Sequence, residues 1–264
     1  FYDETRGAGL RGAESQARGA HFSAAFAQNT TLNGWRVQGW AALTDFVNSS
    51  VSVAADRNSA TPAADQYETP AFGAGANIAY RERDGALEWE IGADARYAEG
   101  ESHERFRNLG AGFTRGRIAG GASAVAGAYG EASFETGAWL FAGGLRADYA
   151  AAFDAHRYEY DLVSNAATLN ETPADSDEIV PSARLGVRRD LGAVDLRAAA
   201  YGGFRPPTLN ELHRPFRVGN DVTEANAALS SEQLIGAEIG AGGESWSVTL
   251  FYNRLDNADR KSVV

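Results

Sequence analysis

Seven basic residues gather in two polar stretches of the sequence and are the first candidates for binding chemistry. The flat, forked guanidinium group of arginine suits carboxylate or catecholate groups on an anionic ligand. We therefore predict a ligand-binding set made of Arg105, Arg107, Arg115, Arg117, His213, Arg214 and Arg217. The alternative role for the same side chains is pairing with the abundant acidic residues around them.

Patterns that would support catalysis or a bound cofactor are missing or stand in the wrong context. The run Gly7–Gly12 fits the GxGxxG dinucleotide pattern, but polar residues flank it where a strand and a helix are needed. The sequence has no GxSxG elbow, HExxH helix or phosphate-binding loop, and its four histidines are scattered. Four acidic residues could hold calcium, or simply form a solvated loop: Glu171, Asp175, Asp177 and Glu178. We expect no enzyme, no cofactor and no metal.

The composition is that of a folded protein with an acidic balance. The 264 residues carry a formal net charge of −11, with a pI near 4.9 and no cysteine. Nucleic-acid binding needs a basic face, so we predict no nucleic-acid partner, and the lack of cysteine excludes disulfides and thiol catalysis. No uncharged run reaches the ~20 residues that a membrane helix needs, so any membrane crossing must use strands.

Apolar residues recur at every second position in several segments, which indicates β-strands. In 86–97, Leu87, Trp89 and Ile91 share one face, and Glu88 and Glu90 share the other. Similar alternation, with glycine and alanine blurring 117–134, predicts about ten strands, including 17–28, 72–80, 138–153, 194–205 and 246–252. Charges at every second position would interrupt the apolar stripe of a helix, so helices fit these segments poorly.

Short turns and long polar stretches alternate along the chain. Short turns are expected at 32–34, 83–85, 135–137, 190–192 and 241–244, and long polar loops at 1–15, 48–68, 99–115, 154–178 and 206–230. This rhythm is typical of an outer-membrane barrel, with short periplasmic turns and longer extracellular loops. Trp35, Trp139 and Trp246 stand at short turns, where an aromatic girdle would place them. We predict an all-β, antiparallel transmembrane β-barrel whose charged strand faces line the lumen and pair across neighbouring strands.

The stretch 201–238 carries the most specific local signals. Pro206 and Pro207 remove two amide donors, so a strand paired on both sides must end at Arg205. Thr208 and Glu211 have the spacing of a capping box, which predicts a short helical turn just beyond that strand.

Two runs in this stretch, FRPPTLNEL and NAALSSE, closely resemble a segment in the β-barrel of TonB-dependent outer-membrane receptors. In that family, an aromatic-basic-x-Pro-Thr/Ser-x-x-Glu-Leu run is followed by an Asn-x-x-Leu-x-x-Glu run. The matching residues, which we expect to fix the start of the loop rather than to contact a ligand, are Phe204, Arg205, Pro207, Thr208, Glu211, Leu212, Asn226, Leu229 and Glu232.

The resemblance implies a receptor that takes up a scarce solute, most often a ferric siderophore, sometimes cobalamin or a carbohydrate. It implies as partners the lipid of a Gram-negative outer membrane, a plug domain, TonB, and a small ligand such as a metal chelate bound on external loops and the upper lumen wall. Residues 1–264 would form roughly half of such a barrel. No plug domain, closing strand, signal peptide or initial Met is seen, so we expect a piece of a longer protein.

Two alternatives remain open at this point. A passive porin or a small complete barrel would share the strand pattern and need no energy-supplying partner. A secreted β-sandwich that binds carbohydrate or adheres to surfaces would present the charged strand faces to water.

Overall fold

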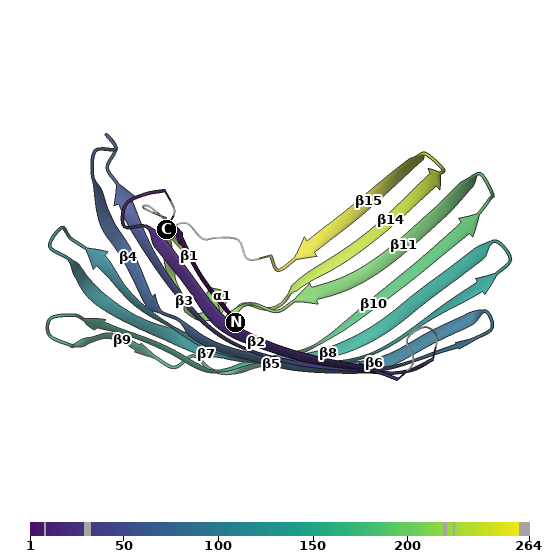
Figure 1. Ribbon diagram of the computed structural model, residues 1–264, viewed down its shortest axis with the longest axis horizontal. Helices are drawn as coiled ribbons and strands as arrows, with labels where there is room; N and C mark the ends of the chain where they lie inside the picture. The colour runs from purple at the N-terminus through teal and green to yellow at the C-terminus, as the bar shows by residue number, and fades with distance from the viewer. Residues whose placement is uncertain (8, 29–32, 219–220, 224, 259–264) are drawn as a thin grey trace.

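The protein is seen in a computed structural model that describes residues 1–7, 9–28, 33–218, 221–223 and 225–258. Within these residues, 13 strands form one antiparallel sheet curved into a trough, and two more form a small separate sheet (Figure 1). A five-residue helix, α1 (Leu209–His213), follows β11. The strands are β1 (Tyr2–Gly7), β2 (Glu14–Ala27), β3 (Gly34–Val53), β4 (Ala60–Glu68), β5 (Pro70–Asp84), β6 (Leu87–Asn108), β7 (Phe113–Thr136), β8 (Trp139–Asp161), β9 (Ala167–Glu171), β10 (Ser176–Asp190), β11 (Val194–Arg205), β12 (Phe216–Val218), β13 (Asp221–Thr223), β14 (Glu232–Gly243) and β15 (Trp246–Asp256).

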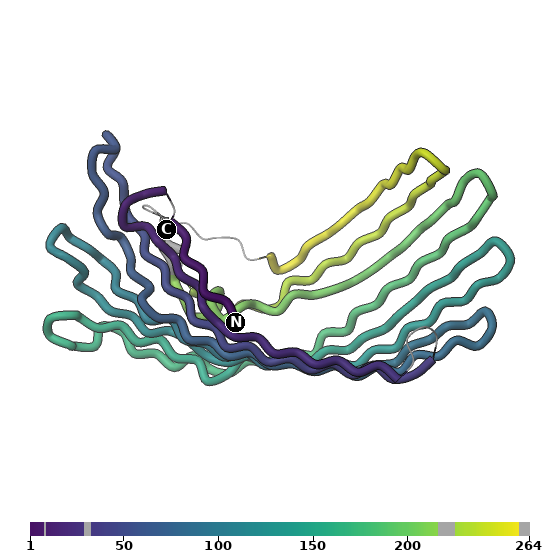
Figure 2. Tube along the Cα trace, in the orientation of Figure 1, coloured from purple at the N-terminus to yellow at the C-terminus, as the bar shows by residue number. Residues whose placement is uncertain are grey.

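The large sheet is a meander in which strands that follow each other along the chain lie side by side (Figure 2). Both β4 and β5 pair with β3 and with β6, so they occupy one position end to end. Both β9 and β10 pair with β8 in the same way. The described strands therefore fill eleven positions across the sheet, close to the about ten strands that the sequence predicts. A single curved sheet of this width differs from the two facing sheets of a β-sandwich.

Short turns lie together at one end of the trough, on the right in Figure 1, as the alternation of turn lengths predicts. Gly85 follows β5 with φ of 58°, and Gly137 follows β7 with φ of 56°, a left-handed conformation that glycine adopts without steric cost. Trp139 and Trp246 begin β8 and β15 at this end, and Trp35 is the second residue of β3. Residue 32 of the turn expected at 32–34 lies outside the described residues.

At the other end, most residues expected in long loops are instead in strands. β6 continues to Asn108 and β7 starts at Phe113, so only four residues separate them. β3, β4 and β8 also extend into the polar stretches, and β1 occupies most of the first seven residues. The extension of β6 is polar on both faces, and a shift of register interrupts the alternation in β8, so the period of two is hidden, but the backbone groups still pair in ladders. Within the described residues, only the stretch between β11 and β14 leaves the large sheet for a long distance.

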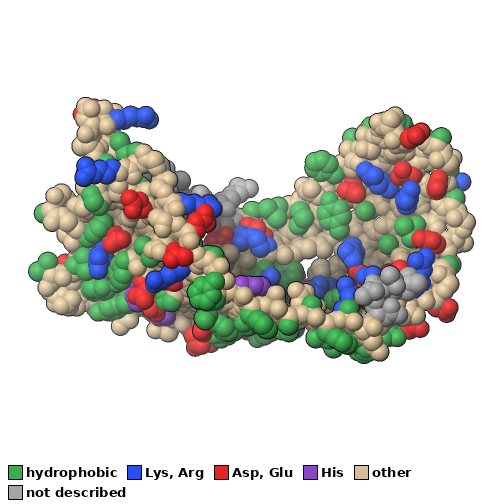
Figure 3. All heavy atoms as spheres, in the orientation of Figure 1, with side chains coloured by type: hydrophobic (Ala, Val, Ile, Leu, Met, Phe, Trp, Pro, Cys, Tyr) green, Lys and Arg blue, Asp and Glu red, His purple; other side chains and the backbone are tan. Residues whose placement is uncertain are grey.

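The two faces of the sheet differ in chemistry. Large apolar side chains stand exposed on the convex face, among them Leu145, Leu185, Ile235 and Leu250. Charged side chains gather in the hollow of the trough, which we call the inner wall (Figure 3). Among the described residues, no helix is long and apolar enough to span a membrane.

Opposite charges pair across strands on the inner wall, as the alternation predicts. Arg146 on β8 reaches across β7 to Asp94 on β6, at 2.6 and 2.9 Å, and also binds Asp148 at 2.8 Å. Glu90 accepts hydrogen bonds from Arg36 at 2.6 Å and from Arg81 at 2.8 Å. These bridges tie together strands that are one or two positions apart in the sheet.

Candidate functional site

The strand β11 ends at Arg205, where the two prolines predict its end. Thr208 then caps α1: its hydroxyl accepts from the amide of Glu211 at 3.3 Å, and the Glu211 carboxylate accepts from the amide of Thr208 at 2.7 Å. Both halves of the capping box are therefore present. The local residues thus turn the chain out of the sheet and start a short helix.

Arg205 fastens this turn to the sheet. Its guanidinium donates to both carboxylate oxygens of Glu211 at 3.0 Å, and to Glu232 at the start of β14 at 2.8 Å. The hydrogen bond from Arg205 lowers the pKa of Glu211 to about 2, against the cost of partial burial. The amide of Asn226 donates to the carbonyl of Glu211 at 3.1 Å, so the two runs of the family-like stretch meet here.

Replacing Glu211 by glutamine is expected to weaken α1 by about 1 kcal/mol, because the charge-assisted bonds to Arg205 and half of the capping box are lost. The pKa of Glu211 is lowered in the folded protein, so its contribution is complete above about pH 4.5 and is lost as the pH falls towards 2. Hydrogen exchange at the amides of Leu212 and Arg214 measures the change. A Thr208→Ser variant, which keeps the capping hydroxyl, should exchange like the wild type; equal exchange in both variants would contradict the capping role.

The far end of α1 is held against the inner wall by a second group of charges. Arg214 donates to Glu104 of β6 at 2.6 Å and to Gln66 of β4 at 3.1 Å. Glu104 also accepts from Arg117 of β7 at 3.2 Å, and Arg117 binds Glu159 of β8 at 2.7 Å. Arg117 in addition donates to the carbonyl of Pro215 at 2.9 Å. We call Glu104, Arg117, Glu159 and Arg214 the wall cluster; its two carboxylates and two guanidinium groups balance in charge.

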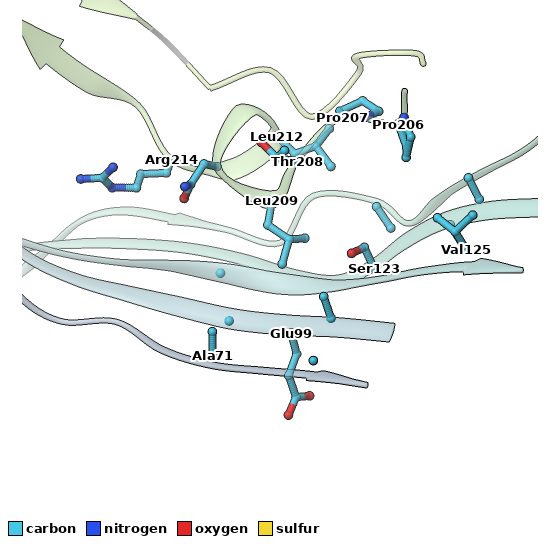
Figure 4. Close-up of a pocket in the computed structure, with 18 of the residues that line it drawn as sticks. Ala71, Glu99, Ser123, Val125, Pro206, Pro207, Thr208, Leu209, Leu212 and Arg214 are labelled. Atoms are coloured by element: carbon cyan, nitrogen blue, oxygen red, sulfur yellow. The ribbon is translucent and has the colours of Figure 1, made fainter. Parts of the chain in front are cut away.

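A cavity of about 710 Å³ lies between the α1 segment and the inner wall. Its roof includes Pro206, Pro207 and Leu209, and its floor includes Ser123 and Val125 of β7, whereas the nearby Glu99 points away to the other face (Figure 4). The floor is made largely of small residues from β3, β5, β6, β7 and β8: Ala42, Gly73, Ala98, Gly100, Ala119 and Ala150. This volume falls within the range of small-molecule sites.

Two polar side chains at this interface are buried without hydrogen-bond partners. Ser102 lines the cavity from β6 and is 3% exposed, and its hydroxyl oxygen has no partner. His213, the last residue of α1, is also 3% exposed, and neither ring nitrogen has a partner. Burial lowers the pKa of His213, and the charge of Arg157 lowers it further.

The seven predicted ligand-binding residues do not form one site. Arg117, His213 and Arg214 come together where α1 meets the wall. Arg105 lies on β6, pairs with Asp65 at 3.4 Å and stacks 4.4 Å above the ring of Tyr67.

The other predicted residues are spread over the hairpins. Arg115 binds Asp161 at 3.2 Å. Arg107 is exposed and, among the described residues, makes no ion pair. The side chain of Arg217 lies outside the described part of the structure. Pairing with acidic neighbours is thus what the structure shows for most of the set, and ligand binding stays a prediction.

Sequence reasoning missed the residues that receive α1. Glu104 and Ser102 alternate on one face of β6, but they fall in a stretch expected as loop. The acidic patch offered for calcium is not assembled either: Glu178 accepts from the amide of Ser231 at 3.3 Å, and the described residues contain no group of three potential ligands that could hold a metal ion.

Comparison with known proteins gives a family model and similar solved structures. Residues 2–258 match the family model described as TonB dependent receptor-like, beta-barrel. No curated protein sequence matches the chain.

Three of the similar structures have names that state what those proteins do. The ferric yersiniabactin uptake receptor FyuA from Yersinia pestis aligns over 95% of this chain and 37% of its own, with a TM-score of 0.65 at 11% identity. The copper transporter OprC aligns over 92% and 39%, with a TM-score of 0.67 at 16% identity. The ferric citrate transporter FecA, unliganded, aligns over 93% and 35%, with a TM-score of 0.58 at 14% identity. These likenesses show a shared fold, and the chain spans just over a third of each of these proteins.

Proposed function

This chain belongs to the family of TonB-dependent receptor-like β-barrels, and from that membership we propose that the intact protein imports a scarce solute with energy delivered through TonB. The proteins of this family are located in the outer membrane of Gram-negative bacteria, and so is this one. The match over residues 2–258 is the observation that carries the proposal. The inner wall, polar and wide, supports it, because a lumen that passes a solute must be wet.

We further propose that the solute is an anionic metal chelate, with a ferric siderophore as the first candidate. The names of FyuA and FecA state ferric chelates for those proteins, and the name of OprC states copper. In this chain, Arg96 lines the cavity under α1, and its guanidinium suits carboxylate or catecholate groups. Arg105, Arg107 and Arg115 on the hairpins would meet such a chelate before it enters.

The proposed partners include elements that this chain does not span. We propose that residues 1–264 form part of the barrel domain, and that further residues of a longer protein supply a plug domain and the strands that close the barrel. TonB would act on the plug from the periplasmic side, where the short turns lie.

Uptake of radioactive iron by cells tests the proposed function. A strain that lacks other iron receptors is given the full-length protein and ferric chelates of carboxylate, catecholate and uncharged types. We expect uptake of an anionic chelate at submicromolar concentration, and we expect it to disappear when TonB is deleted. Uptake that persists without TonB and rises linearly with concentration would instead indicate a passive porin.

The convex face supplies a prediction about membrane insertion. Leu145 is 71% exposed on this face of β8, and replacing it by arginine is expected to destabilise the barrel by about 2–4 kcal/mol, because a charge would then face lipid. Urea unfolding of the full-length protein in lipid vesicles measures the loss. Arginine at Ser133, which lines a hollow of the inner wall, is the matched control and should cost far less. Equal losses for both variants would contradict this assignment of the two faces.

A further inference from the structure

His213 is an ionisable group in a place where burial and nearby positive charges together disfavour its protonation. It ends α1, and α1 packs on β7 and β8. Gly121 of β7 lies against the ring, since a Cβ added there would come within 3.4 Å of His213 Cδ2. Both ring nitrogens are buried without a partner. The docked position of α1 therefore suits the neutral imidazole and opposes the imidazolium.

The charged groups around His213 further disfavour protonation of its ring. From β8, Arg157 and His156 both act on the ring as positive or potentially positive charges. Arg157 already pairs with Glu171 at 3.0 Å, and His156 already contacts Glu101 at 2.6 Å. From β6 and β7, the charged groups next to the α1 segment are Glu104 and Arg117, which are engaged in the wall cluster. Within α1, Glu211 is bound to Arg205. The four carboxylates named here, Glu101, Glu104, Glu171 and Glu211, thus each already have a basic partner.

We propose that protonation of His213 releases α1 from the inner wall and opens the cavity beneath it, so that the site is regulated by the pH outside the cell. The biological meaning of this regulation rests on the proposed function, whereas the release itself does not. The Arg205 end of α1 holds while the wall end moves, because Glu211, with its pKa of about 2, stays ionised throughout the range in which histidine titrates. The α1 segment would then swing about its attachment to β11.

The direction and the size of the effect follow from linkage. The pKa of His213 is lowered in the docked state, so docking is fully favoured above the ordinary value of about 6.5 and is progressively lost as the pH falls below it. Between pH 7.5 and 5.5, the ratio of released to docked protein should rise by up to about tenfold. The bond from Arg214 to Glu104 opposes release, so the docked form predominates at neutral pH.

A thiol placed beneath α1 can report the release. Ser102→Cys is almost isosteric, replaces a hydroxyl that has no partner, and puts the thiol in the covered floor of the cavity. The full-length protein, in outer-membrane vesicles, is labelled with a maleimide at pH 7.5 and 5.5. Each rate is divided by that of Ser59→Cys, an exposed position at the tip of the β3–β4 hairpin, to remove the pH dependence of the thiolate. We expect the ratio to rise several-fold to about tenfold at pH 5.5.

Two histidine variants identify the group responsible. His213→Leu fills the same space without a charge, so the ratio should no longer change with pH, whereas His156→Gln should keep most of the response. A flat ratio in the protein carrying Ser102→Cys alone, or a response that survives His213→Leu, would overturn the inference. If labelling responds as expected while TonB-dependent uptake fails, the proposed function is wrong and the inference stands. If uptake succeeds with flat labelling, only the inference falls.

Discussion

Replacing Arg146 by alanine should lower the free energy of unfolding of the full-length barrel by about 3–5 kcal/mol, because its guanidinium group binds two carboxylates on the inner wall. Asp148 is 2% exposed and receives both the Nε and an Nη hydrogen bond of Arg146. Asp94 receives the two Nη groups at 2.6 and 2.9 Å. Without the guanidinium, Asp148 would be a buried charge with no counterion, which costs more than the pair contributes.

Urea unfolding in lipid vesicles measures the loss, and Arg188→Ala is the matched control. Arg188 is an arginine on β10 whose contact with Asp195 is long, at 3.8 Å, and exposed, so its loss should cost less than about 1 kcal/mol. Comparable losses of unfolding free energy for Arg146→Ala and Arg188→Ala would contradict the stabilising role of the Arg146 bridge.

Gly127 tests the same bridge without removing a charge. It lies on β7 between Asp94 and Asp148, and a Cβ there would overlap the guanidinium of Arg146. Gly127→Val should therefore destabilise the barrel. The double variant with Arg146→Ala should lose clearly less stability than the sum of the two single losses, because both substitutions disrupt the same interaction.

Replacing Glu104 by glutamine should detach the wall end of α1 at neutral pH. The Glu104 side chain is 5% exposed and holds both Arg214 and Arg117, so its neutral analogue leaves two guanidinium groups short of a counterion. We expect a loss of about 3 kcal/mol of docking free energy, which is about a hundredfold in the docked-to-released ratio. Arg117 retains Glu159, which limits the loss.

Maleimide labelling of Ser102→Cys at pH 7.5 provides the measurement, and Glu99→Gln is the control. Glu99 lies on the same strand but on the opposite face, where it accepts from the Tyr97 hydroxyl at 2.5 Å (Figure 4). Fast labelling in the Glu104 variant alone is the expected result. Slow labelling in both variants would mean that the apolar contacts of Leu212, rather than the wall cluster, hold α1.

The family and the class of fold were predictable from the sequence, and so was the local course of the chain after β11. Period-two alternation identified the central parts of β6, β8 and β11, because each face of those strands meets a different environment. It failed in the extension of β6, where both faces are polar, and in β8 beyond Asp154, where a shift of register exchanges the two faces. For the first of these reasons, Glu104 and Ser102 were not recognised as the receiving surface for α1.

What the sequence alone determined depends on neighbours along the chain: the end of β11 at two prolines and the capping box of Thr208 and Glu211 involve residues at most a few positions apart. The contact of Arg214 with Glu104, 110 residues away, depends on how the strands assemble. The faces of His156 and Arg157 were decided in the same way. The register between β7 and β8 shifts at Gly120–Ala122, opposite a left-handed Asp154, which turns His156 towards Glu101 on the outer face and Arg157 inward. A register shift of one residue moves every side chain beyond it to the opposite face of the sheet. The position of such a shift is fixed only by how the strands pair.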